Sequence, residues 1–71
     1  MKGTITPNMN KEKGYGFITP EGMEDKKENN VFFHSSSVEG MTFEELNPGD
    51  MVEFDKEASD KGDRAVHVKR V

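Results

Sequence analysis

The chain has 71 residues, with 10 basic side chains against 14 acidic ones, a formal net charge of −4 and no cysteine. A chain of this length forms one small domain, expected to span residues 1–71, and the lack of cysteine excludes disulfides and thiolate metal sites. A negative chain does not bind a polyanion through bulk charge, because phosphate-binding proteins are usually basic. Any contact with nucleic acid must therefore use a local surface.

No segment has the composition of a targeting or membrane-spanning sequence. Residues 1–10 contain no apolar run that is typical of a signal peptide. No stretch approaches the ~18 apolar residues of a membrane span. Together with the lack of cysteine, these features predict a protein of the reducing cytoplasm that has no membrane partner.

Short β-like segments separated by turn residues recur along the chain, and helical periodicity is nearly absent. The first segment is interrupted by Pro7, which cannot donate to a ladder, so we expect a sheet edge or a bulge there. A charged loop at 23–30, a helical turn near Val38 capped by the serines at 35–37, and a polar loop at 58–63 separate the later segments. Segments this short favour a small closed or partly open barrel. The predicted strands are residues 4–10, 14–19, 31–34, 51–56 and 64–71.

Strict alternation orients the last two predicted strands. In residues 51–56 it places Val52 and Phe54 on one face, and Glu53 and Asp55 on the other. In residues 64–71 it places Val66 and Val68 inward, and His67 and Lys69 outward.

The predicted strands at 14–19 and 31–34 carry more aromatic side chains than one face needs. Alternation puts Tyr15 and Phe17 on one face and Ile18 on the other. It likewise separates Phe32 and His34 from their neighbours Val31 and Phe33. If Ile18, Val31 and Phe33 fill the core, the other four rings point to solvent together. Such an exposed apolar patch usually marks a binding surface. The alternative, in which these rings are themselves core, stays open at this point.

Nucleic-acid bases suit such a patch, because each base has a π-face and stacking on an aromatic ring is worth roughly 1–3 kcal/mol. Lys11 and Lys13 precede Tyr15 closely enough to reach the flanking phosphates. Gly14 and Gly16 are expected to leave room beside the rings, although glycine in a strand also marks bulges.

Two segments resemble the ribonucleoprotein motifs of cold-shock domains, in the family's order and at a compatible spacing. Residues 13–20 (KGYGFITP) resemble the first motif and residues 31–34 (VFFH) the second. The resemblance implies a five-stranded antiparallel oligonucleotide-binding (OB-fold) barrel that binds single-stranded RNA or DNA and acts as an RNA chaperone, and some members influence transcription or translation. By position it assigns stacking to Tyr15, Phe17, Phe32, His34 and Phe43, with Lys13 as a polar contact. The likeness continues through Leu46, Gly49, Val52, Phe54, Lys61, Gly62, Ala65 and Val68.

The chain departs from the family pattern in the first strand and after the second motif. Pro7, Asn8 and Met9 stand where members usually have a lysine, a tryptophan and a phenylalanine, and Ser35 stands where many have another aromatic residue. The loop at 23–30 is longer and more charged than usual. We therefore expect weaker binding, over fewer nucleotides, than a typical member shows.

No arrangement of residues points to catalysis. His34 and His67 lack spaced carboxylate or thiolate partners, so no metal or other cofactor is expected. No serine lies in a nucleophile elbow, and a barrel this small has little volume for a water-excluding pocket. The sequence therefore predicts a binding protein rather than an enzyme.

A protein-interaction module is the alternative function. The same aromatic patch would then hold a partner protein or a second copy of the chain, and the net charge of −4 favours this reading. A monomer is expected and a homodimer stays open. Salt dependence discriminates the two functions, because phosphate contacts weaken steeply with salt and apolar docking does not.

Overall fold

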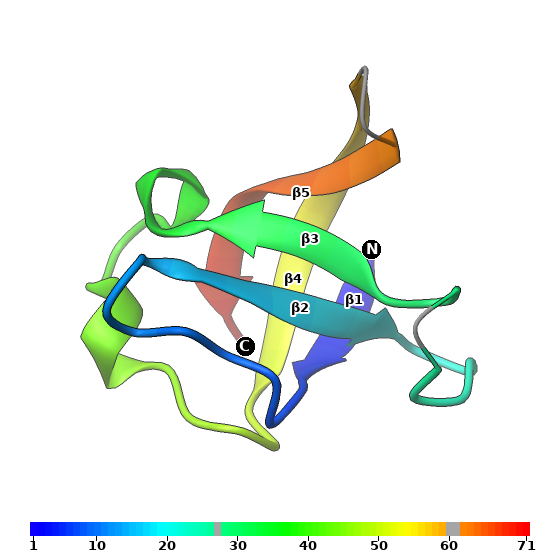
Figure 1. Cartoon of the computed structure of the whole chain (residues 1–71), viewed down its shortest axis with the longest axis horizontal. Coiled ribbons are helices and arrows are strands. Elements are labelled where there is room, and N and C mark those ends of the chain that lie inside the picture. Colours follow the sequence, from blue (N-terminus) through cyan, green and yellow to red (C-terminus); the bar gives the residue numbers. More distant parts are fainter. Residues whose placement is uncertain (27, 60–61) are drawn as a thin grey trace.

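The computed structural model describes residues 1–26, 28–59 and 62–71, which form a barrel of five strands. The strands are β1 (Lys2–Ile5), β2 (Tyr15–Pro20), β3 (Val31–His34), β4 (Met51–Ser59) and β5 (Gly62–Arg70). They close in the order β1-β2-β3-β5-β4, which confirms the predicted all-β barrel (Figure 1). Two short 3-10 turns, η1 (Ser35–Ser37) and η2 (Phe43–Glu45), lie between β3 and β4. Among the described residues, no helix is long and apolar enough to cross a membrane.

The sheet is mixed, whereas a purely antiparallel one was expected. Neighbouring strands pair antiparallel except β3 and β5, which run parallel with Phe32 beside Arg64. The reason is one of parity. A closed ring with an odd number of strands cannot alternate direction at every pair, so at least one parallel pair is required.

The first strand is shorter than predicted and ends before the proline. β1 stops at Ile5, two residues ahead of Pro7, and residues 6–9 leave the sheet. Proline has no N–H to donate to a ladder, so the chain turns out of the sheet there rather than continuing along an edge. The bridge of Asn10 to Tyr15 then brings the chain back to β2.

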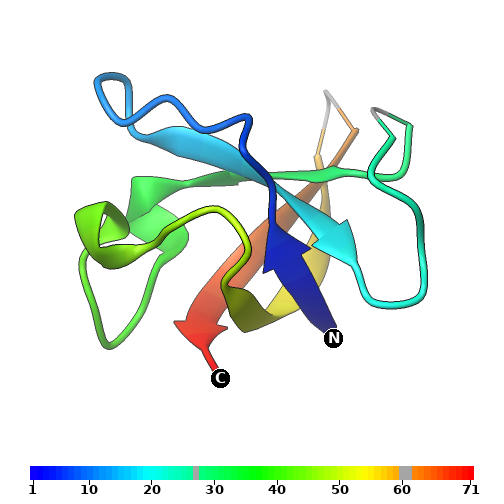
Figure 2. The same ribbon diagram turned by 90° about the horizontal axis from the view of Figure 1, so that it is seen from below.

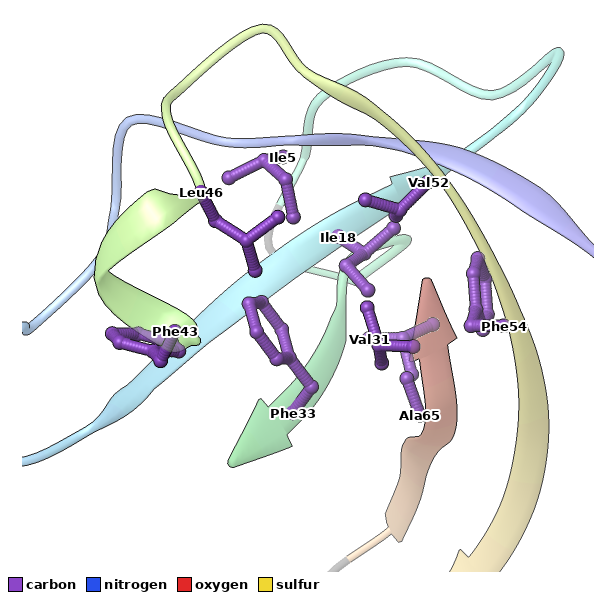
Figure 3. Packing of buried hydrophobic residues seen from close by; sticks show 10 residues of the cluster. Ile5, Ile18, Val31, Phe33, Phe43, Leu46, Val52, Phe54 and Ala65 are labelled. Carbon is purple, nitrogen blue, oxygen red and sulfur yellow. The ribbon is translucent and has the colours of Figure 1, made fainter. Parts of the chain in front are cut away.

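The barrel interior is filled by one cluster of apolar side chains, and alternation on β2 and β3 selects its members. Ile18 and Phe33 are fully buried and Val31 is 3% exposed, which decides the alternative that the sequence left open. On β4, Val52 and Phe54 share one face, as predicted, and the structure shows that this face points inward. Figure 3 shows these side chains converging with residues of β1, β5 and η2. The cluster consists of Ile5, Ile18, Val31, Phe33, Phe43, Leu46, Val52, Phe54, Ala65 and Val68.

A β-bulge in β5 breaks the alternation predicted for the last strand. The register moves from Glu53 beside Lys69 to Asp55 beside Val66, so two residues of β5 oppose one of β4. His67 is the extra residue, with φ at 53°. Consequently Ala65 and Val68, three positions apart, both face inward, whereas Val66 is only half-buried. The prediction that Val66 faces the core was therefore wrong.

β4 and β5 extend beyond the barrel as a hairpin (Figures 1 and 2). Each strand has nine residues, so the predicted segments at 51–56 and 64–71 were too short toward the hairpin. Ion pairs join its two strands on both faces, with Lys56 3.3 Å from Asp63 and Glu57 2.8 Å from Arg64. Of the polar loop predicted at 58–63, residues 60 and 61 lie outside the described part of the chain.

Candidate nucleic-acid interface

The outer face of β2 and β3 carries a cluster of three aromatic rings. The antiparallel register sets Tyr15 opposite His34 and Phe17 opposite Phe32. The rings of Tyr15 and Phe32 lie 5.8 Å apart, those of Phe17 and Phe32 5.9 Å, and those of Tyr15 and Phe17 6.3 Å. These are favourable separations for tilted and edge-on contacts, so the rings hold one another in place. We call Tyr15, Phe17 and Phe32 the ring cluster.

The ring cluster lies on the surface and not in the core. Phe32 is 37% exposed, while its chain neighbour Phe33 is fully buried. Tyr15 and Phe17 are half-buried, because each is partly covered by the other rings. The sequence left open whether these rings are core, and the structure decides for the outer face.

His34 extends the ring cluster and also begins the η1 turn. Its Nδ1 accepts a hydrogen bond from the backbone N–H of Ser36 at 3.1 Å and lies 3.0 Å from the Ser36 hydroxyl. In the neutral ring the proton is therefore on Nε2. The expectation that serines cap this turn was wrong, since Ser35–Ser37 form the turn and His34 is its N-cap.

Gly16 of β2 makes room inside the barrel, whereas Gly14, just before β2, makes room for the start of the η1 turn. A Cβ on Gly16 would lie 2.9 Å from the ring of Phe33, so this position must stay bare for the core to close. Gly14 has φ at +73°, and a Cβ there would lie 2.9 Å from the Ser35 hydroxyl oxygen. Both glycines therefore affect the ring cluster only through the course of the backbone on either side of Tyr15.

The turn at 11–14 places two lysines at one end of β2 (Figure 2). The backbone N–H of Lys13 donates to the Asn10 side chain at 2.9 Å, which orders the turn, and the Lys13 side chain is exposed. Lys11 differs, because its ammonium group donates to the backbone carbonyl of Glu44 at 3.3 Å. The Lys13 side chain makes no hydrogen bond of this kind to the described residues.

Phe43 is placed differently from the other residues assigned to stacking. It lies on η2, is 7% exposed, and its ring is 5.6 Å from that of Phe33 (Figure 3). The 3-10 turn directs the ring inward, where it covers one end of the core. Phe43 therefore offers little ring face to a base, and its assignment to stacking stays a prediction.

Arg64 lies next to the ring cluster, and sequence reasoning missed it. The parallel pairing of β3 and β5 puts Arg64 beside Phe32, so a row runs from Phe17 through Phe32 to Arg64 across three strands. Its guanidinium is 2.8 Å from the Glu57 carboxylate. No local pattern reveals this neighbour, because the two residues are 32 positions apart in the chain.

At the other end of the ring cluster, Phe17 borders an open hollow of about 610 Å³. The hollow lies between the segment that follows β1 and the connection from β2 to β3. Its lining residues are Thr6, Pro7, Asn8, Phe17, Asp25 and Asn30. Neither this hollow nor any other part of residues 1–26, 28–59 and 62–71 gathers three side chains that suit a metal ion.

Comparison with known proteins identifies the family. The family model described as "'Cold-shock' DNA-binding domain" matches residues 1–71. The chain is 41% identical over 68 residues to Cold shock protein 1 of Lactiplantibacillus plantarum, covering 96% of each chain. The chain belongs to the cold-shock domain family.

Other relatives agree with this assignment. The Major cold shock protein of Micrococcus luteus is 42% identical over 62 residues, or 87% of each chain. Among solved structures, drosophila Unr CSD456 matches with a TM-score of 0.70 at 22% identity, over 99% of this chain and 26% of that one. That likeness supports the fold alone. Cold-shock domains are in general nucleic-acid-binding proteins.

The departures of this cold-shock domain fall around the ring cluster. Pro7 and Asn8 are exposed and line the hollow beside Phe17. Met9 is half-buried and packs against the core. Ser35 is half-buried in η1, where its N–H donates to the carbonyl of Gly14 at 2.7 Å. Thus Asn8 is a small polar side chain beside Phe17, and Ser35 is one beside Gly14.

Proposed function

We propose that this cold-shock domain binds single-stranded RNA or DNA with little sequence preference and, in the cytoplasm, acts as an RNA chaperone. The observation that carries the proposal is the ring cluster, three mutually supported rings on one face with His34 beside them. Two or three bases stacked there would bind with a free energy of several kcal/mol, at roughly 1–3 kcal/mol each.

The chaperone activity follows from competition between two kinds of stacking. A base that lies on Tyr15, Phe17 or Phe32 cannot at the same time stack within a hairpin. Weak hairpins are therefore held open, without a covalent step, a cofactor or an energy source. Each contact is modest, so release is fast and the RNA can refold. One copy of the chain presents the whole ring cluster, so no second copy is needed.

Phe32 and Phe33 provide the test, because they are consecutive phenylalanines on opposite faces of β3. Phe32→Ala should weaken binding of a heptathymidine by about tenfold or more, since one stacking ring is lost, and should hardly change the urea unfolding midpoint. Phe33→Ala removes a fully buried ring and should cost about 3–5 kcal/mol of unfolding free energy. Phe33→Leu, which keeps the core filled, should bind as the wild type does. Fluorescence anisotropy and urea denaturation measure the two effects.

Two results would contradict the proposal. Unchanged affinity in Phe32→Ala would show that bases do not lie on this ring. A wild-type protein that binds no oligonucleotide at low salt would favour docking of a protein partner on the same face. The chaperone part is tested by opening of a weak RNA hairpin labelled with a fluorophore and a quencher, which Phe32→Ala should no longer promote.

A further inference from the structure

The hollow beside Phe17 continues the stacking face into a more polar region. Asn8 lines it from the segment after β1, and Asp25 and Asn30 line it from the connection between β2 and β3. A base that lies on Phe17 has its edge available to such groups. The side chains around the hollow are therefore the groups that the edge of such a base would meet.

Two hydrogen bonds fix the amide of Asn30 and, through it, Asp25. The hydroxyl of Thr19, a residue only 9% exposed on β2, donates to Asn30 Oδ1 at 2.8 Å. The amide nitrogen of Asn30 then donates to Asp25 Oδ1, also at 2.8 Å. The loop is further ordered by the backbone N–H groups of Asn29 and Asn30, which both donate to the carbonyl of Lys26. The Asp25 carboxylate is thus held at the hollow.

A carboxylate at this place discriminates between bases, because it only accepts hydrogen bonds. It has about four lone-pair sites, and the bond from Asn30 uses one. Thymine and uracil present two carbonyl oxygens and one N–H on their pairing edge. Guanine presents two adjacent donors, the N1–H and the 2-amino group, which match the two oxygens of a carboxylate. Its O6 is an acceptor for an amide N–H such as that of Asn8.

We propose that Asp25 reads the pairing edge of the base on Phe17 and favours guanine at that one position. This inference rests on the proposed function and refines it, because the other rings stay tolerant of any base. It also gives a role to Asn8, whose small amide leaves the hollow open to the edge of the base.

The experiment measures affinities for heptathymidine and for heptamers in which one thymidine is replaced, position by position, by dG. The best dG position should bind the wild type about tenfold more tightly than heptathymidine, as expected for a bidentate contact. Inosine at that position lacks the 2-amino group and should give a smaller gain. A single dA there controls for the stronger stacking of a purine and should not reproduce the gain.

Asp25→Asn is the decisive variant, because its side-chain oxygen can still accept the bond from Asn30 and so keep the loop. It should bind the dG heptamer within about twofold of heptathymidine. Glu28→Gln is the matched control, since it removes an equal charge from an exposed position in the same loop, and it should retain the tenfold preference.

The outcomes separate this inference from the proposed function. Equal binding of heptathymidine and every dG heptamer would overturn the reading by Asp25 and leave the stacking function intact. A guanine preference that persists in Asp25→Asn would also overturn it, because another group would then be responsible. Absence of binding to any heptamer would overturn both proposals.

Discussion

Side chains that are neighbours in the barrel, and not in the chain, complete the surface around the ring cluster. Phe32 is the clearest case. Its cross-strand partner on one side is Phe17 and on the other Arg64. Arg64 therefore places a cation beside a ring on which a base would stack, and we expect it to contact a phosphate of the bound strand. The ion pair with Glu57 keeps its guanidinium ordered at the surface.

Arg64→Gln should weaken oligonucleotide binding several-fold and reduce the slope of log K against log salt by about 0.7, the value for one phosphate contact on a single strand. Lys69→Gln is the control, because it removes the same charge from the far end of β5, where Lys69 lies 3.9 Å from Glu39. It should leave the slope unchanged. Salt titrations monitored by anisotropy give both slopes, and equal slopes for the two variants would remove Arg64 from the interface.

At the scale of elements, the bulge in β5 fastens the segment after η1 to the barrel. Val38 forms a parallel bridge with Val68, and the Glu39 N–H donates to the Val68 carbonyl at 2.8 Å. His67, the bulged residue, lies 2.5 Å from the Glu39 carboxylate through its Nδ1. The hydrogen bond to Glu39 raises the pKa of His67 above its ordinary 6.5. The same bond lowers the pKa of Glu39 below its ordinary 4.5.

These shifts give the stability a pH dependence of known sign. The contribution of His67 is complete below pH 6.5 and is lost as pH rises through its raised pKa, while that of Glu39 is complete above pH 4.5 and is lost as pH falls through its lowered pKa. The pair therefore stabilises most between these values. We expect the wild-type urea midpoint to fall as pH rises from 6.5 toward 9 more than that of His67→Asn, a residue that tolerates the positive φ. In Glu39→Gln the urea midpoint should likewise fall less with pH than in the wild type. Equal dependence of the midpoint on pH in all three proteins would refute the assignment of this effect to the His67–Glu39 pair.

For the whole molecule, the net charge of −4 means that long-range electrostatics oppose the approach of a nucleic acid. Binding must then come from stacking, with a small number of local phosphate contacts. Among the described residues, Lys13 lies in the turn before Tyr15 and Arg64 lies beside Phe32, so both are cations next to the ring cluster. Two such contacts predict a modest salt dependence.

With about −0.7 per contact, the slope of log K against log salt should be about −1.4, so affinity for heptathymidine falls roughly 25-fold from 0.05 to 0.5 M salt. A heptamer with an uncharged methylphosphonate backbone is the control and should show almost no salt dependence. A slope steeper than about −3 would mean that phosphates, and not bases, carry most of the binding. A slope near zero for the natural heptamer would mean docking without phosphate contacts.

The sequence alone determined which face each residue of β2 and β3 shares with its neighbours. The reason is that side chains in a strand alternate at every residue. Ile18 therefore lies on the opposite face from Tyr15 and Phe17, and Val31 and Phe33 share a face opposite to Phe32. The all-β character and the position of β3 followed from the same local pattern. The predicted end of the first strand near Pro7 and the predicted length of the hairpin were less accurate, because both depend on which strands pair.

The tertiary structure decided what depends on residues that are distant in the chain. Closure of five strands imposed the parallel pair and brought Arg64 to Phe32. Because of the bulge at His67, Ala65 faces the core and Val66 does not. Packing of η2 turned Phe43 inward onto Phe33, and the hydrogen bonds of Thr19 and Asn30 set Asp25 at the hollow. None of these contacts has a local signal, because each is selected by closing one small barrel around a single core.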